Sequence, residues 1–352
     1  MITPQNILVI RFSSLGDIVL ATPLLRALRA RFPSAHIDFI VRKEYAELVK
    51  YNPNLTKCYE FDTTAGFSGL QKLKKRLRTE RYDLVIDIHN SIRSRYLRIW
   101  LDAQEVVLIN KRMFARIMFV KFKKNLYGDT VSVADRYIEP VTKFGVQNDG
   151  AGLELPIPDE ISARAGEAIA LSEINRSGSV IGLCPSAKHA TKCWPSERFA
   201  ELGSGLIQTG ETTILLFGGP SDVKTCSTIA QTIRTTSKAS SIIDLSGKLS
   251  LLETAAAMKF CDVIVTNDSG LMHIAAAMKR KVVALFGSTV REFGFFPVGT
   301  ENIVIERAGL YCRPCSHIGC SECPEGHFRC MKEIRVDEVE QCVRRFLGTG
   351  NN

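Results

Sequence analysis

The sequence contains no long apolar segment. No apolar run approaches the roughly 18 residues that a membrane-spanning helix needs, which argues against a transmembrane protein. The first residues, Met1 to Asn6, pass directly into the apolar run Ile7–Ile10, without the basic stretch and long apolar core of a secretory signal. We therefore expect a cytoplasmic protein.

Two familiar nucleotide-binding fingerprints are also missing. The loop after the first apolar run lacks the three-glycine pattern of dinucleotide-binding domains, and the chain lacks the Gly-Lys-Ser/Thr of a P-loop. The first absence counts against a nicotinamide dehydrogenase. The sequence also has no internal repeat of 20–50 residues and no low-complexity tract, so a solenoid is not indicated.

What is present is the composition and rhythm of a two-domain α/β protein. The chain has 352 residues, with 45% hydrophobic and 24% charged, which suits two soluble domains with a core each. Short apolar runs alternate with helical patterns, as in a parallel sheet covered on both faces. The expected strands are Ile7–Ile10, His36–Val41, Leu84–Ile88, Val106–Ile109, Val180–Leu183, Thr213–Phe217, Ile242–Leu245, Val263–Val265 and Lys281–Phe286.

The alternation of predicted strands and helices is interrupted near the middle of the chain and then resumes. Pro, Gly and polar residues over 148–178 indicate an interdomain connection. We therefore predict two Rossmann-like domains, residues 1–165 and 166–332, followed by a C-terminal helix and tail, 333–352. Ligands of such sheets bind at the carboxyl ends of the strands.

Positive charge is concentrated in the first half. Residues 1–150 hold 25 Lys and Arg against 15 Asp and Glu, a net of +10, whereas residues 151–352 carry a net of −1. An anionic ligand, an anionic membrane surface or nucleic acid could each explain this asymmetry. The run Lys72–Arg78, with leucines at helical spacing, indicates only an amphipathic helix with a solvated basic face.

The loop Arg11–Asp17 follows the first strand and opens a helix predicted over Ile18–Arg31. It therefore lies at the carboxyl end of a strand, where Gly16 would allow close approach of a ligand. Asp17 could act on a ligand there. Ser13, Ser14 or Asp17 could equally cap the helix.

Two segments of the second half resemble a phosphate-binding site. Ala190–Pro195 places Lys192 beside a helix start, where an ammonium group and a helix dipole together favour a diphosphate. Thr266–His273 is another strand-to-helix turn, whose backbone N–H groups near Ser269 and Gly270 could hold phosphate oxygens. Structural readings, a surface lysine and a core histidine, remain open for both segments.

A further turn and a cysteine cluster complete the candidates. Asp222 follows Gly218-Gly219 after a strand and could bind ribose hydroxyls, although a plain turn is the stronger explanation. Five cysteines fall within 19 residues, and two Cys-x2-Cys pairs could hold a structural zinc as thiolates. Reduced thiols without metal explain the loop equally well. The predicted zinc ligands are Cys312, Cys315, Cys320 and Cys323.

Together these segments resemble glycosyltransferase family 9, which includes the ADP-heptose–lipopolysaccharide heptosyltransferases. The resemblance spans almost the whole chain in the order typical of the family. The segments that carry it are Ile7–Pro23, Asp87–Ser94, Lys192–Pro195, Asp244–Gly247, Asn267–His273 and Cys312–Met331.

The resemblance implies a GT-B fold, in which two Rossmann-like domains face a central cleft. It implies an inverting, metal-independent transfer of heptose from ADP-heptose to the inner core of lipopolysaccharide, with Asp17 as general base. The donor residues that it implies are Thr191, Lys192, Asp222, Asp268, Ser269, Gly270 and His273. No cofactor is then required for catalysis, and the chain contains no Asp-x-Asp metal motif.

The resemblance also implies an anionic lipid A–Kdo acceptor, which suits the basic first half and peripheral contact with the cytoplasmic face of the inner membrane. The acceptor-side residues that we expect are Ser13, Ser14, Gly16, Arg93 and Arg95. The segment Asp87–Asn90 departs from the pattern of many relatives, so another sugar or acceptor stays open. A zinc-containing nucleic-acid-binding protein is the weaker alternative, because no nucleic-acid motif is present; we expect no nucleic-acid partner.

Overall fold

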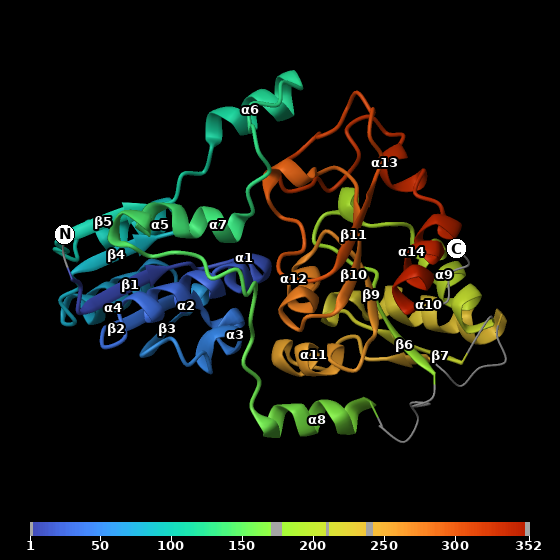
Figure 1. The fold of residues 1–352 in the computed structure, drawn as a ribbon, viewed down its shortest axis with the longest axis horizontal. Coiled ribbons are helices and arrows are strands. Elements are labelled where there is room, and N and C mark those ends of the chain that lie inside the picture. The colour runs from blue at the N-terminus through green and yellow to red at the C-terminus, as the bar shows by residue number, and fades with distance from the viewer. Residues whose placement is uncertain (1–2, 170–177, 209–210, 237–241, 349–352) are drawn as a thin grey trace. The chain divides into compact units, whose positions relative to one another are not determined.

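The computed structural model describes residues 3–169, 178–208, 211–236 and 242–348. The chain divides into two compact units, each built on one sheet (Figure 1). Unit 1 comprises Met1–Met113 and Val131–Pro156, and unit 2 comprises Phe114–Thr130 and Ile157–Asn352. Among the described residues, no helix is long and apolar enough to cross a membrane.

The sheet of unit 1 is fully parallel, with the strand order β3-β2-β1-β4-β5. Leu8 and Ile10 of β1 pack in one core cluster with leucines of α4 and α5. These alternate residues therefore lie on one face of the sheet, and the residues between them lie on the other. The strands are β1 (Asn6–Ile10), β2 (His36–Arg42), β3 (Lys57–Phe61), β4 (Leu84–Asp87) and β5 (Glu105–Leu108). The helices are α1 (Leu15–Leu20), α2 (Thr22–Arg31), α3 (Glu47–Lys50), α4 (Gly66–Arg78), α5 (Ile92–Arg98) and α7 (Val133–Ile138).

The sheet of unit 2 is also parallel, in the order β11-β10-β9-β6-β7-β8. Its strands are β6 (Ser179–Cys184), β7 (Thr212–Leu216), β8 (Ile242–Asp244), β9 (Val263–Asn267), β10 (Lys281–Phe286) and β11 (Asn302–Glu306). The helices of this unit are α6 (Met113–Phe122), which begins at the last residue of unit 1, α8 (Asp159–Ile169), α9 (Ser196–Gln208), α10 (Val223–Thr236), α11 (Leu251–Met258), α12 (Gly270–Ala277), α13 (Arg329–Lys332) and α14 (Val336–Leu347). Two Rossmann-like parallel-sheet units are therefore confirmed.

All nine expected strands are present, within two residues at each end. The helix expected over Ile18–Arg31 is instead two helices, α1 and α2, which meet at Ala21 just before Pro23. The helix expected around Lys72–Arg78 is α4, which buries Leu70, Leu73 and Leu77 and leaves most of its basic side chains exposed.

The boundary between the units differs from the expected one at residue 165. Unit 2 begins its main stretch at Ile157, because α8 packs on α11 and Arg164 pairs with Glu253 at 2.8 Å. The C-terminal helix α14 packs on α9 and contributes Val343 and Phe346 to the core of unit 2. It is therefore part of that domain.

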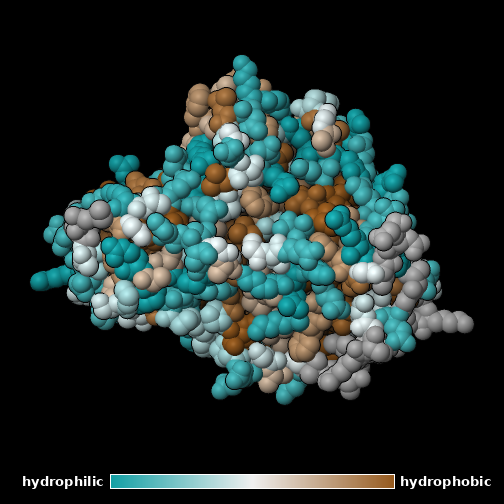
Figure 2. All heavy atoms as spheres, in the orientation of Figure 1, coloured by the Kyte–Doolittle hydropathy of each residue, from teal (hydrophilic) through white to brown (hydrophobic). Residues whose placement is uncertain are grey.

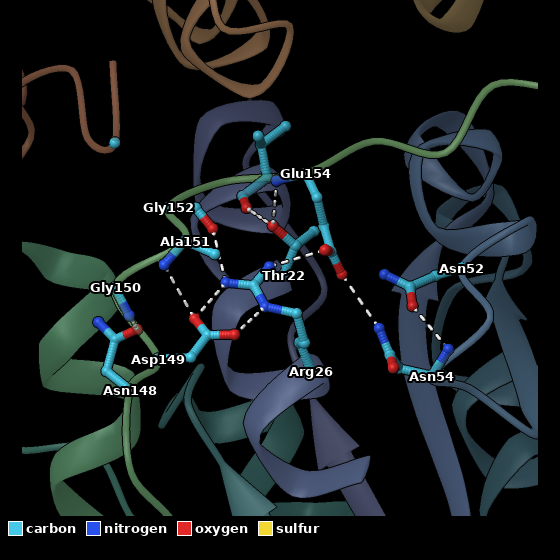
Figure 3. Close-up of polar contacts among 12 residues, drawn as sticks. Thr22, Arg26, Asn52, Asn54, Asn148, Asp149, Gly150, Ala151, Gly152 and Glu154 are labelled. Carbon is cyan, nitrogen blue, oxygen red and sulfur yellow. Dashed lines mark hydrogen bonds and ion pairs between the residues drawn. The ribbon is translucent and has the colours of Figure 1, made fainter. Parts of the chain in front are cut away.

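The segment after α7 is fixed to unit 1 by Arg26 of α2 (Figure 3). The guanidinium group binds both oxygens of Asp149 at 2.6 and 2.7 Å, Glu154 at 2.7 Å and the carbonyl of Gly152 at 2.9 Å. Asn54 donates to the other oxygen of Glu154 at 3.0 Å. The first residues of the expected connection, 148–154, are therefore held to the first domain.

Arg26→Met is expected to lower the free energy of unfolding by about 1 to 2 kcal/mol, because four hydrogen bonds are lost from a partly exposed site. The measurement is urea denaturation followed by circular dichroism. Lys57→Met is the matched control, since it breaks an exposed pair with Glu80 and a cation–π contact with Tyr59, and should cost less than about 1 kcal/mol. Equal losses in the two variants would contradict the role given to Arg26.

Candidate functional site

Asp17 lies in the first turn of α1, directly beyond the carboxyl end of β1, and is 9% exposed. One carboxylate oxygen accepts from the backbone N–H of Ser14 at 3.0 Å and from its hydroxyl at 2.7 Å. The other pairs with Arg11 at 2.7 Å and accepts from the Tyr137 hydroxyl at 2.9 Å. The carboxylate therefore caps α1 through Ser14 and also meets a cation and a phenol.

These contacts set the protonation state of Asp17. Burial alone would raise the pKa of this carboxyl, but the Arg11 guanidinium and the hydrogen bonds from Ser14 and Tyr137 outweigh burial and lower the pKa to about 2. The carboxylate is therefore ionised at neutral pH. Its pKa also makes it a weak base for as long as all four donors stay in place.

The surroundings of Asp17 include two residues that the sequence did not single out. Arg11 donates to the carbonyl of Ile88 at 2.7 Å and lies 5.5 Å from the ring of Tyr137. Tyr137 comes from α7, 120 residues along the chain, so no local pattern could have linked it to Asp17. Arg11 is the first residue after β1, and that position is a signal that could have been used.

The expected acceptor-side residues fall into two groups. Gly16 is buried in α1 while Ser13 and Ser14 are more open, and all three lie within the loop and turn around Asp17. Arg93 and Arg95 are exposed on α5, without an ion-pair partner among the residues that the structure describes. Their guanidinium groups are therefore accessible to an anionic acceptor, whereas Arg98 of the same helix binds Asp87 at 2.9 Å.

Unit 2 brings together residues from three strand ends. Lys192 pairs with Asp268 at 2.7 Å, and the hydroxyl of Thr289 donates to the same carboxylate oxygen at 2.6 Å. Asn267 accepts from the backbone N–H of Trp194 at 3.0 Å, which ties the lysine loop to the end of β9. Thr191 is 3.0 Å from the hydroxyl of Ser288, beyond β10. The predicted donor residues around Lys192 and Asp268 are thus adjacent.

The turn that leads into α12 has an unsatisfied polar atom. The hydroxyl oxygen of Ser269 is buried and has no hydrogen-bond partner among the described residues. Gly270 is the first residue of α12, and His273 is buried one turn further on. A free hydroxyl, the N-terminus of a helix and the nearby Lys192 together suit an anionic group such as a diphosphate.

The Asp222 carboxylate forms hydrogen bonds within its own turn. It accepts from the backbone N–H of Gly219 at 2.8 Å and from the hydroxyl of Ser221 at 3.3 Å. The side chain is half-buried. This geometry favours the plain turn, and the binding of ribose by Asp222 stays a prediction.

The cysteine loop does not form a metal-ligand set. In the described chain, no three His, Cys, Asp or Glu side chains are gathered as metal ligands, although Cys312 and His327 are 3.8 Å apart. Burial, then the neighbouring cysteines, raise the pKa of Cys315 to about 11. The side chains as arranged therefore do not fit zinc, and zinc stays a prediction that elemental analysis of untagged protein checks.

The cysteine loop also has a structural role. The backbone N–H of Cys320 donates to the hydroxyl of Thr191 at 2.8 Å, and the backbone N–H of Thr191 donates to the carbonyl of Cys320 at 3.2 Å. The methyl-bearing threonine is almost fully buried there. The cysteine loop therefore positions the segment that carries Lys192.

Comparisons with known proteins identify the family. The family model described as glycosyltransferase family 9 (heptosyltransferase) matches residues 70–325. Lipooligosaccharide heptosyltransferase 2 of Haemophilus influenzae is 28% identical over 315 residues, which cover 82% of this chain and 85% of that protein. Lipopolysaccharide heptosyltransferase 2 of Escherichia coli is 29% identical over 306 residues, which cover 82% and 84%.

Solved structures are similar in fold. The glycosyl transferase family 9 structure from Veillonella parvula superposes with a TM-score of 0.81 at 24% identity, covering 97% of both chains. The ADP-heptose lipopolysaccharide heptosyltransferase II of E. coli superposes with a TM-score of 0.74 at 23% identity, covering 97% of this chain and 98% of that one. The GT-B class expected from the sequence is thereby confirmed.

Proposed function

The chain belongs to glycosyltransferase family 9, and on that premise we propose that it transfers heptose from ADP-heptose to the inner core of lipopolysaccharide. The transfer inverts the anomeric centre and requires no metal ion. The observation that carries the proposal is the cluster of Lys192, Asp268 and the free Ser269 hydroxyl at the start of α12. The named relatives, which are heptosyltransferases, support the choice of sugar.

The donor binds in the second domain through its diphosphate. Lys192 faces one phosphate, while the Ser269 hydroxyl and the backbone N–H groups that begin α12 donate to the other. Binding of the anion draws the ammonium group of Lys192 away from Asp268, whose carboxylate keeps the hydrogen bond from Thr289. Asp268 is then the residue that holds Lys192 in place before the donor arrives.

The reaction is a single displacement. The acceptor hydroxyl attacks the anomeric carbon, its proton passes to Asp17, and the bond from that carbon to the phosphate oxygen breaks with its electrons on ADP. Attack from the face opposite the leaving group inverts the centre. Lys192 and the N-terminus of α12 stabilise the negative charge that develops on ADP, a task that needs positive charge rather than a particular metal.

Asp17 is suited to this role once an acceptor is bound. The carboxylate is already ionised, but four donors hold its pKa near 2. An acceptor hydroxyl that takes the place of the Tyr137 or Ser14 hydroxyl on the carboxylate keeps the number of donors unchanged and brings the proton to be transferred. That hydroxyl becomes acidic as its oxygen attacks the anomeric carbon, so Asp17 accepts the proton in the transition state despite its lowered pKa.

The acceptor is an anionic lipid A–Kdo-type saccharide, reached at the cytoplasmic face of the inner membrane by peripheral contact. The net charge of +10 over residues 1–150 and the exposed Arg93 and Arg95 support an anionic acceptor. A related transferase with another sugar or acceptor is the second candidate, supported by the departure over Asp87–Asn90. There the Asp87 carboxylate accepts from the backbone N–H groups of His89 and Asn90.

A calorimetric screen of ADP-, UDP- and GDP-sugars, paired with a transfer assay in EDTA, tests the proposed function. We expect ADP-heptose to bind with a Kd at least about tenfold below those of the UDP- and GDP-sugars, and to be consumed in the presence of a lipid A–Kdo acceptor and EDTA. Preferential binding of another nucleotide-sugar would contradict ADP-heptose as the donor and identify that nucleotide-sugar in its place. Transfer that stops in EDTA and returns with a divalent cation would contradict metal independence.

A further inference from the structure

Helix α6 (Met113–Phe122) is anchored to unit 2 through Phe119 and through Lys123, which follows the helix. Phe119 packs with Tyr127 and Phe293, with ring centroids 5.8 to 6.3 Å apart in the three pairs. At the end of the helix, the ammonium group of Lys123 donates to the carbonyls of Cys312 at 3.0 Å and Pro314 at 2.7 Å. The inner face of α6 is therefore fixed in place.

The outer face of α6 is apolar and exposed. Residues 113, 117 and 121 form one row at helical spacing, and residues 114, 118 and 122 form the adjacent row. Phe114 and Phe122 are 71% and 62% exposed, and Met113 and Ile117 are 50% and 44% exposed. In Figure 2, brown and tan atoms lie among teal ones over this helix at the top of the view. Two phenylalanines this open are unusual on a surface that meets only water.

The charge around this face has one sign. Residues 111–128 contain six Lys and Arg and no Asp or Glu. Lys121 lies in the outer rows, and Lys124 follows the helix close to the exposed Leu126. Both lysines are exposed, and neither has an ion-pair partner in the described part of the chain. An apolar helical face with lysines beside it is complementary to a surface that is anionic outside and apolar beneath.

We propose that the outer face of α6 docks the protein on an anionic lipid bilayer. The helix has 10 residues and is about 15 Å long, too short to span a bilayer, so it lies in the plane of the lipid headgroups. Phe114, Ile117 and Phe122 enter the acyl boundary, while Lys121 and Lys124 meet lipid phosphates. The inference rests on the proposed function only in taking the acceptor to be a membrane lipid.

Sedimentation with vesicles tests the proposal, without donor or acceptor present. The full chain is expected to bind vesicles of phosphatidylethanolamine and phosphatidylglycerol, to bind phosphatidylcholine vesicles poorly, and to dissociate as salt rises. Phe114→Ser combined with Phe122→Ser should weaken binding by about tenfold or more, since binding follows the apolar area buried. Lys121→Gln combined with Lys124→Gln should weaken it at low salt only. Phe260→Ser, an exposed apolar change elsewhere in unit 2, should leave binding intact.

Two further readouts separate this proposal from its alternatives. Wild-type protein that fails to bind anionic vesicles, or serine variants that bind like wild type, would overturn it. A serine variant that changes the solution mass and not vesicle binding would assign the face to a second copy of the chain, and would also overturn it. Transfer to a deacylated, soluble acceptor should be unchanged in the serine variants; its absence in wild-type protein would instead count against the proposed function.

Discussion

Asp17→Asn is expected to lower kcat for heptosyl transfer by about 10²- to 10⁴-fold, the usual contribution of a general base. Donor affinity should stay within about twofold, since the donor residues belong to the other structural unit and the base acts on the acceptor. The measurements are initial rates with ADP-heptose and calorimetry with ADP. A variant that transfers heptose at the wild-type rate would remove Asp17 from the mechanism.

The matched control must account for the structural tasks of Asp17. Asparagine leaves the largely buried guanidinium of Arg11 without its carboxylate, which can destabilise the fold by a few kcal/mol. Tyr137→Phe removes one donor and keeps the ion pair. It should retain most of the activity, whereas Asp17→Asn should lose it in protein that circular dichroism shows to be folded. Equal losses in both variants would assign Asp17 a structural role only.

The pH dependence follows from the same contacts. The pKa of Asp17 is lowered from 3.8 to about 2 in the folded protein, so the stability it contributes is present above about pH 4 and is lost as pH falls towards 2. The shift corresponds to about 2 kcal/mol at neutral pH. Asp17 should therefore contribute no acid limb to the rate profile between about pH 5 and 9. A limb in that range that disappears in Asp17→Asn would contradict the lowered pKa.

The fold could be predicted from the sequence where strands are buried on both faces. Runs such as residues 7–10 and 282–286 are continuously apolar because helices cover both sides of a parallel sheet. The strands β3 (Lys57–Phe61) and β11 (Asn302–Glu306) were not anticipated. Both lie at sheet edges and are only partly buried, so polar residues interrupt their apolar pattern.

The candidate site was predictable as far as strand ends identify it. Lys192 and Asp268 were each found as loop residues after a strand, but their pairing across 76 positions needed the fold. Tyr137 lies in a segment with no distinguishing pattern, and Thr289 follows the predicted strand Lys281–Phe286. Only the fold shows that these residues touch the carboxylates of Asp17 and Asp268. Sequence spacing locates the ends of strands, but tertiary packing determines which residues at those ends contact the same carboxylate.

Lys192→Met is expected to lower kcat/KM for ADP-heptose by about 10²- to 10³-fold, because it removes the cation that stabilises the departing diphosphate. Affinity for ADP should fall while affinity for adenosine stays the same, since adenosine lacks the phosphates that Lys192 binds. Calorimetry with both ligands measures the difference. Equal losses for ADP and adenosine would mean that the whole pocket is disturbed and would contradict a specific contact with phosphate.

The ion pair with Asp268 provides the decisive comparison. Lys192→Met leaves a buried carboxylate whose remaining side-chain partner among the described residues is Thr289, so part of any loss could come from that uncompensated charge. In the double variant Lys192→Met with Asp268→Asn, the buried charge is gone. If Lys192 binds the diphosphate, the double variant stays as poor as Lys192→Met in binding ADP. If Lys192 serves only to neutralise Asp268, the double variant recovers ADP binding, and the source of positive charge for the leaving group must then be the N-terminus of α12.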